Sequence, residues 1–253
     1  MGPKPSFFPL KPVVPRADWT VYFVYAPDGL LTPAHCFTLS RLRDLGMNLF
    51  VVCATRTVGE VPEALAAYAD ALYWKALRGF DFSAYALALN VIARQSPHAR
   101  VLLLNDSVFG PFVDVRHRID GAPWDLTGFT ASSRIENHVQ SYSFVIKDVT
   151  RARVRSLWPV FFPRISLNTH VAVTLCQETR LARVAARSMS VGAYWYADAG
   201  KMSDPVLVRP FELLDAGFPF LKKSLVGKHS RFNPENAAEA YLAMQRHPLE
   251  RPL

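Results

Sequence analysis

The chain has 253 residues, of which half are hydrophobic and one fifth are charged. This length allows one large domain with a buried core, and the composition is that of a globular rather than a disordered protein. The sequence has no run of about 18 consecutive apolar residues that could cross a membrane. It also lacks the basic segment followed by an apolar run that marks a secretory signal. We therefore expect a cytoplasmic protein.

The formal net charge of +8 predicts attraction to polyanions, which include nucleic acid, anionic lipid headgroups and diphosphate-bearing substrates. The lysines and arginines are scattered, and no zinc-finger spacing or RNA-binding aromatic motif accompanies them, so nucleic acid is the least favoured partner. The three cysteines, Cys36, Cys53 and Cys176, are far apart and odd in number. Their spacing indicates neither a zinc site nor a disulfide framework.

The first half of the chain alternates apolar strands with helices. Residues 1–19 are proline-rich and predict an extended N-terminal arm, and residues 20–253 are expected to form one domain. Thr32 and Pro33 predict the start of a helix that ends before Gly46. The other predictions are strands over 21–25, 49–53 and 101–104, and helices over 61–72 and 82–93. Uninterrupted apolar strands between helices are typical of a mostly parallel sheet covered on both faces, so the sequence predicts an α/β fold.

From about Trp124 the pattern changes. Residues 125–130 and 139–146 predict strands of a mixed sheet around a substrate cleft. Helices are expected over 151–158, over 170–186 and from Asn233 onward, where Pro234 suits a first helical turn. No internal repeat divides this half from the first, which favours a single domain.

Asn105-Asp106-Ser107 directly follows the strand predicted over 101–104. In open α/β sheets, ligands bind beyond the carboxyl ends of the strands. A carboxylate at that position can hold Mg²⁺ or Mn²⁺ against the two phosphates of a sugar nucleotide, and the cation then stabilises the charge on the departing diphosphate. The same residue types favour turns for backbone reasons, so a purely structural turn is the alternative.

Asp125, Glu136 and His138 are candidate general bases near the expected cleft. An inverting sugar transfer needs one group that takes the proton of the acceptor hydroxyl. The alternatives are a surface glutamate and a structural, hydrogen-bonded histidine. Lys222 and Lys223 can neutralise the phosphates of a donor or a lipid linker, or else they are ordinary solvated lysines.

Four stretches, in order along the chain, resemble the motifs of one family. They are Arg78-Gly79-Phe80-Asp81-Phe82, residues 103–111 around Asn105-Asp106-Ser107, residues 124–132 with Glu136, His138 and 140–142 following, and residues 217–225 with Lys222 and Lys223. Together they resemble the rhamnan synthesis protein F family. The resemblance extends from about residue 20 to residue 225.

The resemblance implies a single GT-A-type nucleotide-sugar-binding domain with a mixed, mostly parallel sheet flanked by helices. It implies a glycosyltransferase that builds bacterial surface polysaccharide, such as the O-antigen of lipopolysaccharide or a cell-wall glycan, by inverting transfer of L-rhamnose from dTDP-L-rhamnose. Asn105-Asp106-Ser107 stands where such folds keep an Asp-x-Asp metal motif. Only one of these three residues is a carboxylate, so a divalent cation is one of two alternatives. In the other, Asn105 and Ser107 bind phosphate or ribose of the donor by hydrogen bonds, and a lysine or arginine supplies the positive charge.

On this interpretation the donor phosphates lie near Asp106, and the acceptor lies near Asp125, Glu136 and His138. The acceptor is a glycan on a polyprenyl diphosphate, which suits a basic protein peripheral to the anionic inner face of the plasma membrane, alongside other glycosyltransferases. Two alternatives stay open. One is a UDP-hexose donor such as UDP-galactose or UDP-glucose, and the other is a non-catalytic module that binds nucleotide or polysaccharide.

Overall fold

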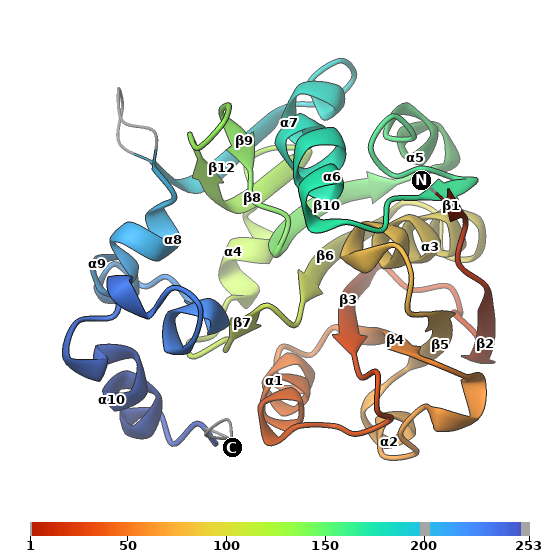
Figure 1. Ribbon diagram of the computed structural model, residues 1–253. Helices are drawn as coiled ribbons and strands as arrows, with labels where there is room; N and C mark the ends of the chain where they lie inside the picture. The colour runs from red at the N-terminus through yellow and green to blue at the C-terminus, as the bar shows by residue number, and fades with distance from the viewer. Residues whose placement is uncertain (1, 198–202, 249–253) are drawn as a thin grey trace.

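The computed structural model describes residues 2–197 and 203–248 (Figure 1). In these residues nine strands form one mixed sheet, in the order β12-β8-β10-β6-β3-β4-β5-β2, with β9 paired to β8. The strands are β2 (Phe7–Lys11), β3 (Asp18–Tyr25), β4 (Asn48–Thr55), β5 (Ala71–Ala76), β6 (Ala99–Asn105), β8 (Leu126–Ser132), β9 (His138–Val139), β10 (Ser143–Val149) and β12 (Val191–Tyr196). The pairings make β12, β8, β6, β3, β4 and β5 run in one direction, and β10 and β2 run against them. The predicted α/β fold with a mostly parallel sheet is confirmed.

Helices cover both faces of this sheet (Figure 1). One face packs against α3 (Phe80–Gln95), α5 (Arg151–Ser156), α6 (His170–Val173), a π-helical turn (Thr174–Glu178) and α7 (Thr179–Ala185). The other face packs against α1 (Pro33–Asp44), α2 (Leu65–Tyr68), α4 (Arg116–Asp120), α8 (Pro205–Val208) and α9 (Pro210–Asp215). Successive residues of β3 show why the strands are apolar throughout: Val21 and Phe23 enter the first core, whereas Tyr22 and Val24 enter the second.

The predicted start of α1 is confirmed. The Thr32 hydroxyl accepts a hydrogen bond from the backbone N–H of His35 at 3.2 Å, and His35 Nδ1 accepts the N–H of Thr32 at 3.2 Å. This pair satisfies two backbone donors at the helix start, and Pro33 occupies the first turn, where its missing N–H costs nothing.

The helix predicted over 61–72 is wrong at both ends. Only α2 is helical there, residues 61–64 form a turn, and Ala71 begins β5. The alanines favour a helix locally, but the Asp70 carboxylate accepts the N–H of Leu49 at 2.8 Å, and the Asp70 N–H donates to the Leu49 carbonyl at 2.7 Å. These two bonds dock the chain beside β4, so that pairing in the sheet overrides local propensity. Strand β12 was also not predicted.

The N-terminal arm is extended and lies on the surface. Its strand β2 pairs with β5 at the edge of the sheet, and β1 (Gly2–Pro3) pairs with β11 (Ile165–Ser166). The first core strand, β3, begins at Asp18, so the last two residues of the arm predicted over 1–19 belong to this strand.

The C-terminal region forms a third apolar cluster beside β7 (Val108–Phe109) and β13 (Leu221–Lys222), which pair with each other. It includes α10 (Ala237–Met244), where Leu242 is buried against the cluster. Within the described part of the chain, no helix has the length and apolar character needed to cross a bilayer.

Candidate active site

Asp106 lies at the carboxyl end of β6, where two other elements hold it. Its Oδ2 atom accepts the N–H of Tyr25, the last residue of β3, at 3.0 Å, and lies 3.2 Å from His35 Nε2 at the start of α1. Because His35 Nδ1 accepts the backbone N–H of Thr32, the ring proton belongs on Nε2, which donates to Asp106. The Asp106 side chain remains 20% exposed, so part of the carboxylate faces outward.

A chain of hydrogen bonds passes through Asn105. The Asn105 amide donates to the Asp81 carboxylate at 2.6 Å, and its Oδ1 accepts both the N–H of Ser107 at 3.0 Å and the Ser107 hydroxyl at 2.6 Å. Since the hydroxyl proton is used toward Asn105, Ser107 Oγ can only accept on its other side. There it lies 3.4 Å from Lys222 Nζ. These hydrogen bonds therefore link Asp81 to the Lys222 ammonium.

Lys222 and Lys223 reach this point from a segment more than 100 residues further along. Lys222 pairs with Val108 across the β7–β13 ladder, and the N–H of Lys223 donates to the Ser107 carbonyl at 3.1 Å. The Lys222 ammonium also lies over the Tyr142 ring, 4.7 Å from its centroid. The structure thus brings the Lys222 ammonium to Asn105-Asp106-Ser107. Lys223 meets Ser107 only through its backbone, and its ammonium lies 5.6 Å from the centroid of the Phe109 ring.

Gly110 permits this approach. Its φ is +111°, and a Cβ added to it would stand 2.5 Å from the carbonyl oxygen of Pro219. The same carbonyl accepts the N–H of Phe112 at 2.9 Å. Glycine is therefore required for close contact between the segment after Ser107 and the segment before Lys222.

Asp81 and Lys75 are two ionisable groups beside the site, of which Lys75 is buried and Asp81 partly exposed. Burial and the charge of Glu178 raise the pKa of the Asp81 carboxyl to about 6, although the hydrogen bond from Asn105 opposes the shift. Burial lowers the pKa of Lys75 to about 7, and the Asp81 charge opposes that shift. The Lys75 ammonium donates to the Arg78 carbonyl at 2.9 Å and lies 5.2 Å from the centroid of the Phe23 ring. The site therefore rests on ionisable groups whose charges vary near neutral pH.

The residues around Asp106 do not form a complete cage for a divalent cation. Asp106 Oδ2 already accepts two hydrogen bonds, and Asn105 Oδ1 accepts two more. Over residues 2–197 and 203–248, no group of three or more histidine, cysteine, aspartate or glutamate side chains is placed to hold a metal, so a cation here would take its other ligands from the donor phosphates. The Lys222 ammonium, 3.4 Å from Ser107 Oγ, brings positive charge to the same position.

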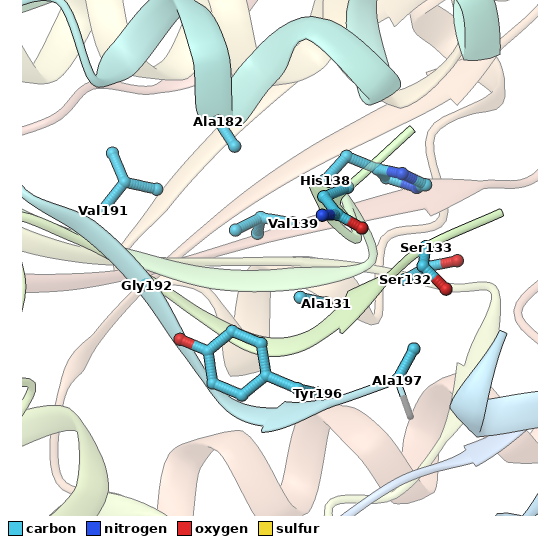
Figure 2. Close-up of a pocket in the computed structure, with 11 residues that line it drawn as sticks. Ala131, Ser132, Ser133, His138, Val139, Ala182, Val191, Gly192, Tyr196 and Ala197 are labelled. Carbon is cyan, nitrogen blue, oxygen red and sulfur yellow. The ribbon is translucent and has the colours of Figure 1, made fainter. Parts of the chain in front are cut away.

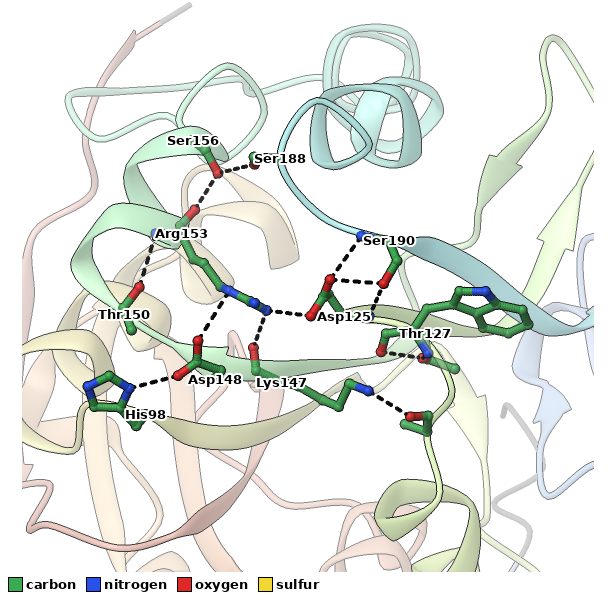
Figure 3. A network of polar contacts seen from close by, with 12 residues as sticks. His98, Asp125, Thr127, Lys147, Asp148, Thr150, Arg153, Ser156, Ser188 and Ser190 are labelled. Carbon is green, nitrogen blue, oxygen red and sulfur yellow. Dashed lines mark hydrogen bonds and ion pairs between the residues drawn. The ribbon is translucent and has the colours of Figure 1, made fainter.

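The structure does not bring Asp125 to the site. Leu126, the first residue of β8, pairs with Ile146 of β10, and Ile146 pairs with Val101 near the start of β6. Asp125 therefore lies at the amino end of the parallel strands, whereas Ser107 follows the carboxyl end of β6. Its carboxylate accepts the N–H and hydroxyl of Ser190, both at 2.9 Å, and pairs with Arg153 at 3.0 Å (Figure 3). The Ser190 bonds and the Arg153 charge lower the pKa of Asp125 to about 2. These contacts make Asp125 a structural residue rather than a base for the acceptor.

Glu136 and His138 lie beyond the carboxyl end of β8. Glu136 forms an exposed ion pair with Arg183 at 3.6 Å. His138 is buried, and its Nδ1 donates to the Glu136 carbonyl at 2.7 Å, which leaves a lone pair on Nε2 of the neutral ring.

A pocket of about 450 Å³ opens beside His138, between β9, α7 and β12. Figure 2 shows Val139, Ala182, Val191 and Tyr196 around it, with the His138 ring directed away from Tyr196. The pocket offers a surface of small and apolar side chains with an aromatic ring, which suits a sugar face.

Sequence reasoning missed three acidic residues near Ser107. Asp81 belongs to a family-like motif but was not predicted as a site residue, and neither Asp204 nor Glu178 was predicted as one. Asp204 accepts the Gln140 amide at 3.1 Å; burial raises its pKa, and the charge of Lys222 opposes the shift. Glu178 accepts hydrogen bonds from the backbone and the hydroxyl of Ser141. The available signal was the Gly-x-Asp-Phe element for Asp81, whereas neither Asp204 nor Glu178 stands in a recognisable pattern.

A model of a protein family described as rhamnan synthesis protein F matches residues 49–244. The chain belongs to this family. The match covers all four stretches on which the resemblance was based, and membership supports the predicted glycosyltransferase activity in polysaccharide synthesis. No curated protein matches the sequence significantly.

Three solved structures are similar to the chain at low sequence identity, each with a TM-score of 0.44. HddC from Yersinia pseudotuberculosis is 8% identical, and the match covers 71% of this chain and 90% of HddC. The 4-diphosphocytidyl-2C-methyl-D-erythritol synthase of Anaerococcus prevotii is 11% identical, with 71% of this chain and 87% of that one covered. A Desulfovibrio desulfuricans protein described as a nucleotide-diphospho-sugar transferase is 13% identical, with 92% and 99% covered.

Proposed function

We propose that the protein transfers L-rhamnose from dTDP-L-rhamnose, with inversion, onto a growing bacterial surface polysaccharide. The observation that carries this proposal is the meeting of Ser107 and Lys222 at the carboxyl end of β6, in a chain that belongs to the rhamnan synthesis protein F family. In α/β sheets this edge is where ligands bind, and a diphosphate leaving group needs positive charge there.

The hydrogen bonds of the site favour lysine as the group that binds phosphate. Asn105 and the N–H and hydroxyl of Ser107 are satisfied by one another, so they position the loop rather than donate to a ligand. Lys222 keeps donors for the diphosphate besides its hydrogen bond to Ser107 and its contact with the Tyr142 ring. Lys223 holds the same loop through its backbone bond to Ser107, while its ammonium lies over the Phe109 ring. In this proposal the Lys222 ammonium supplies the charge that a cation supplies elsewhere, and Asp106 binds a hydroxyl of the nucleotide.

The acceptor glycan is proposed to bind beside the pocket that His138 borders, with Glu136 two residues before His138 in the chain. Three cationic side chains lie around His229. Burial lowers the pKa of His229 most, and the charges of Lys228, Arg231 and Arg134 lower it further. Such a group of cations suits the diphosphate of a polyprenyl-linked acceptor and a peripheral position on an anionic inner membrane, where other glycosyltransferases act.

A donor panel tests the proposal. The purified protein is incubated with dTDP-L-rhamnose, UDP-glucose or UDP-galactose and a lipid-linked acceptor, in EDTA, Mg²⁺ or Mn²⁺, and released nucleotide and extended glycan are measured. We expect turnover with the dTDP donor in EDTA. Turnover with a UDP-hexose alone would show that the donor sugar is a hexose rather than rhamnose. A requirement for Mg²⁺ or Mn²⁺ would show that a cation rather than lysine neutralises the diphosphate. Nucleotide binding without turnover would indicate a non-catalytic module.

A further inference from the structure

Glu178 lies at the end of the π-helical turn between α6 and α7. A π-helical turn holds one more residue than an α-helical turn, so it changes the direction in which the following side chains point, and such turns occur frequently at functional sites. Here the turn directs Glu178 toward the carboxyl edge of the sheet, where Ser141 precedes β10. The chain leaves regular helix geometry at the residue that reaches the site.

The Glu178 carboxylate is held firmly by one of its oxygens. Oε1 accepts the N–H of Ser141 at 3.1 Å and the Ser141 hydroxyl at 2.9 Å. Ser141 is itself fixed, because its carbonyl accepts the Tyr85 hydroxyl at 3.1 Å. No hydrogen bond or ion pair from the described residues engages Oε2, and the side chain is partly exposed. One oxygen is therefore oriented, and the other can accept a proton.

This carboxylate contacts the segment that borders the proposed donor site. Tyr142, the residue after Ser141, accepts the N–H of Asn105 on its carbonyl at 3.1 Å and carries the Lys222 ammonium over its ring. The charge of Glu178 also acts on the ionisation of Asp81, Tyr142 and Asp204. Glu178 is therefore bound to the residue next to Tyr142, and Tyr142 contacts both Asn105 and Lys222.

Four other acidic side chains of this region are engaged by other groups. Asp81 accepts the Asn105 amide on one oxygen and the N–H of Phe82 on the other, and Asp204 accepts the Gln140 amide. Glu136 is paired with Arg183, and Asp106 is held by Tyr25 and His35 and is assigned to the nucleotide in the proposed function. A general base must reach the proton that it removes, and a free oxygen at the site meets this condition.

We propose that Glu178 is the general base of the transfer. This proposal rests on the proposed function. As the acceptor oxygen forms its bond to the anomeric carbon, the bond between that carbon and the donor diphosphate breaks. The proton of the acceptor hydroxyl passes to Glu178 Oε2, and the electron pair of the broken bond leaves with the nucleoside diphosphate beside Lys222. Ser141 acts as the positioning residue that keeps the carboxylate oriented.

The test is Glu178→Gln, which preserves the shape and the acceptor oxygen for Ser141 but cannot take a proton. Its kcat is expected to fall roughly 100-fold to 10,000-fold, whereas the rise in melting temperature caused by dTDP stays at the wild-type size. Glu178→Asp keeps a base at a shorter reach and is expected to recover part of the rate. Glu63→Gln, an exposed glutamate elsewhere, is the control for loss of one charge.

The pH profile separates a catalytic from a structural role. The wild-type kcat/KM is expected to rise with pH as the base ionises, and Glu178→Gln is expected to lose that limb. Five ionisable groups lie around this position and are unchanged in the variant. They are Asp81 and Tyr85 of α3, Tyr142 just before β10, Asp204 before α8, and Lys222 of β13. Wild-type turnover by Glu178→Gln would overturn the assignment, as would a loss confined to KM or equal loss of dTDP binding. Absence of transfer by the wild-type protein would instead refute the proposed function.

Discussion

Replacing Lys222 with methionine tests the proposed donor site most sharply. Methionine keeps the length and the apolar stem but removes the ammonium that lies 3.4 Å from Ser107 Oγ. A hydrogen bond to a charged group contributes about 1.5–3 kcal/mol. Losing one from the dTDP diphosphate weakens binding by roughly 10-fold to 150-fold, since about 1.4 kcal/mol corresponds to a factor of ten.

Thermal unfolding measures this loss directly. With dTDP at about 100 times the wild-type Kd, bound nucleotide stabilises the wild-type protein by about 2.7 kcal/mol, whereas a variant with 100-fold weaker binding gains only about 0.4 kcal/mol. For a domain of this size each kcal/mol shifts the Tm by about 2–4 °C, so we expect a shift of roughly 5–11 °C to fall below about 2 °C.

Lys11→Met is the matched control. It removes a lysine of equal charge from β2, at the far edge of the sheet, where Nζ donates to the Ala69 carbonyl. Its dTDP-induced shift is expected to equal that of the wild type. A full shift in Lys222→Met would refute the placement of the diphosphate beside Lys222.

Three further predictions concern residues outside the proposed chemistry. Gly110→Ala is expected to reduce the free energy of unfolding by roughly 1–3 kcal/mol, seen as a lower Tm, because its Cβ would approach the Pro219 carbonyl at positive φ; an unchanged Tm would contradict the contact. Burial lowers the pKa of His247 from 6.5 to about 4, so its contribution to stability is complete above pH 6.5 and is lost as pH falls toward 4. His247→Phe is therefore expected to flatten the fall in Tm between pH 6.5 and pH 4, and an equally steep fall would show that other groups cause it. Asp125→Asn is expected to lower the free energy of unfolding by about 1–3 kcal/mol, through weaker bonds to Ser190 and Arg153, and to retain kcat below its Tm; a lost kcat would restore Asp125 as a base.

Much of the fold follows from local pattern. The apolar runs that became β3, β4 and β6 are buried on both faces, and a run of this kind admits few other structures. The Thr32 hydroxyl accepts one of the backbone N–H groups that a helix start exposes, and Pro33 has no N–H to satisfy. Their position therefore marks the start of α1. The proximity of Asn105-Asp106-Ser107 to a ligand edge also follows, because residues after parallel strands share that edge.

The remainder depends on contacts between distant segments. Residues 125–130 were predicted as a strand, but its direction was not. Asp125 lies at the end of the strands away from Ser107 because β8 runs parallel to β6. Strand β5 forms only through its pairing with β4. Glu178 reaches Ser141 because of a π-helical turn that has no sequence signal comparable to a helix cap. Contacts between segments that are distant in the sequence therefore determine which acidic residues lie in this region.

A crystal structure of the protein with bound dTDP tests the central claim most directly. The account predicts that the diphosphate lies at the carboxyl end of β6, with a phosphate oxygen within hydrogen-bond distance of Lys222 Nζ and the free oxygen of Glu178 facing the position of the missing sugar. A nucleotide bound elsewhere, for example in the pocket between β9, α7 and β12, with Lys222 still on Ser107 alone, would contradict it.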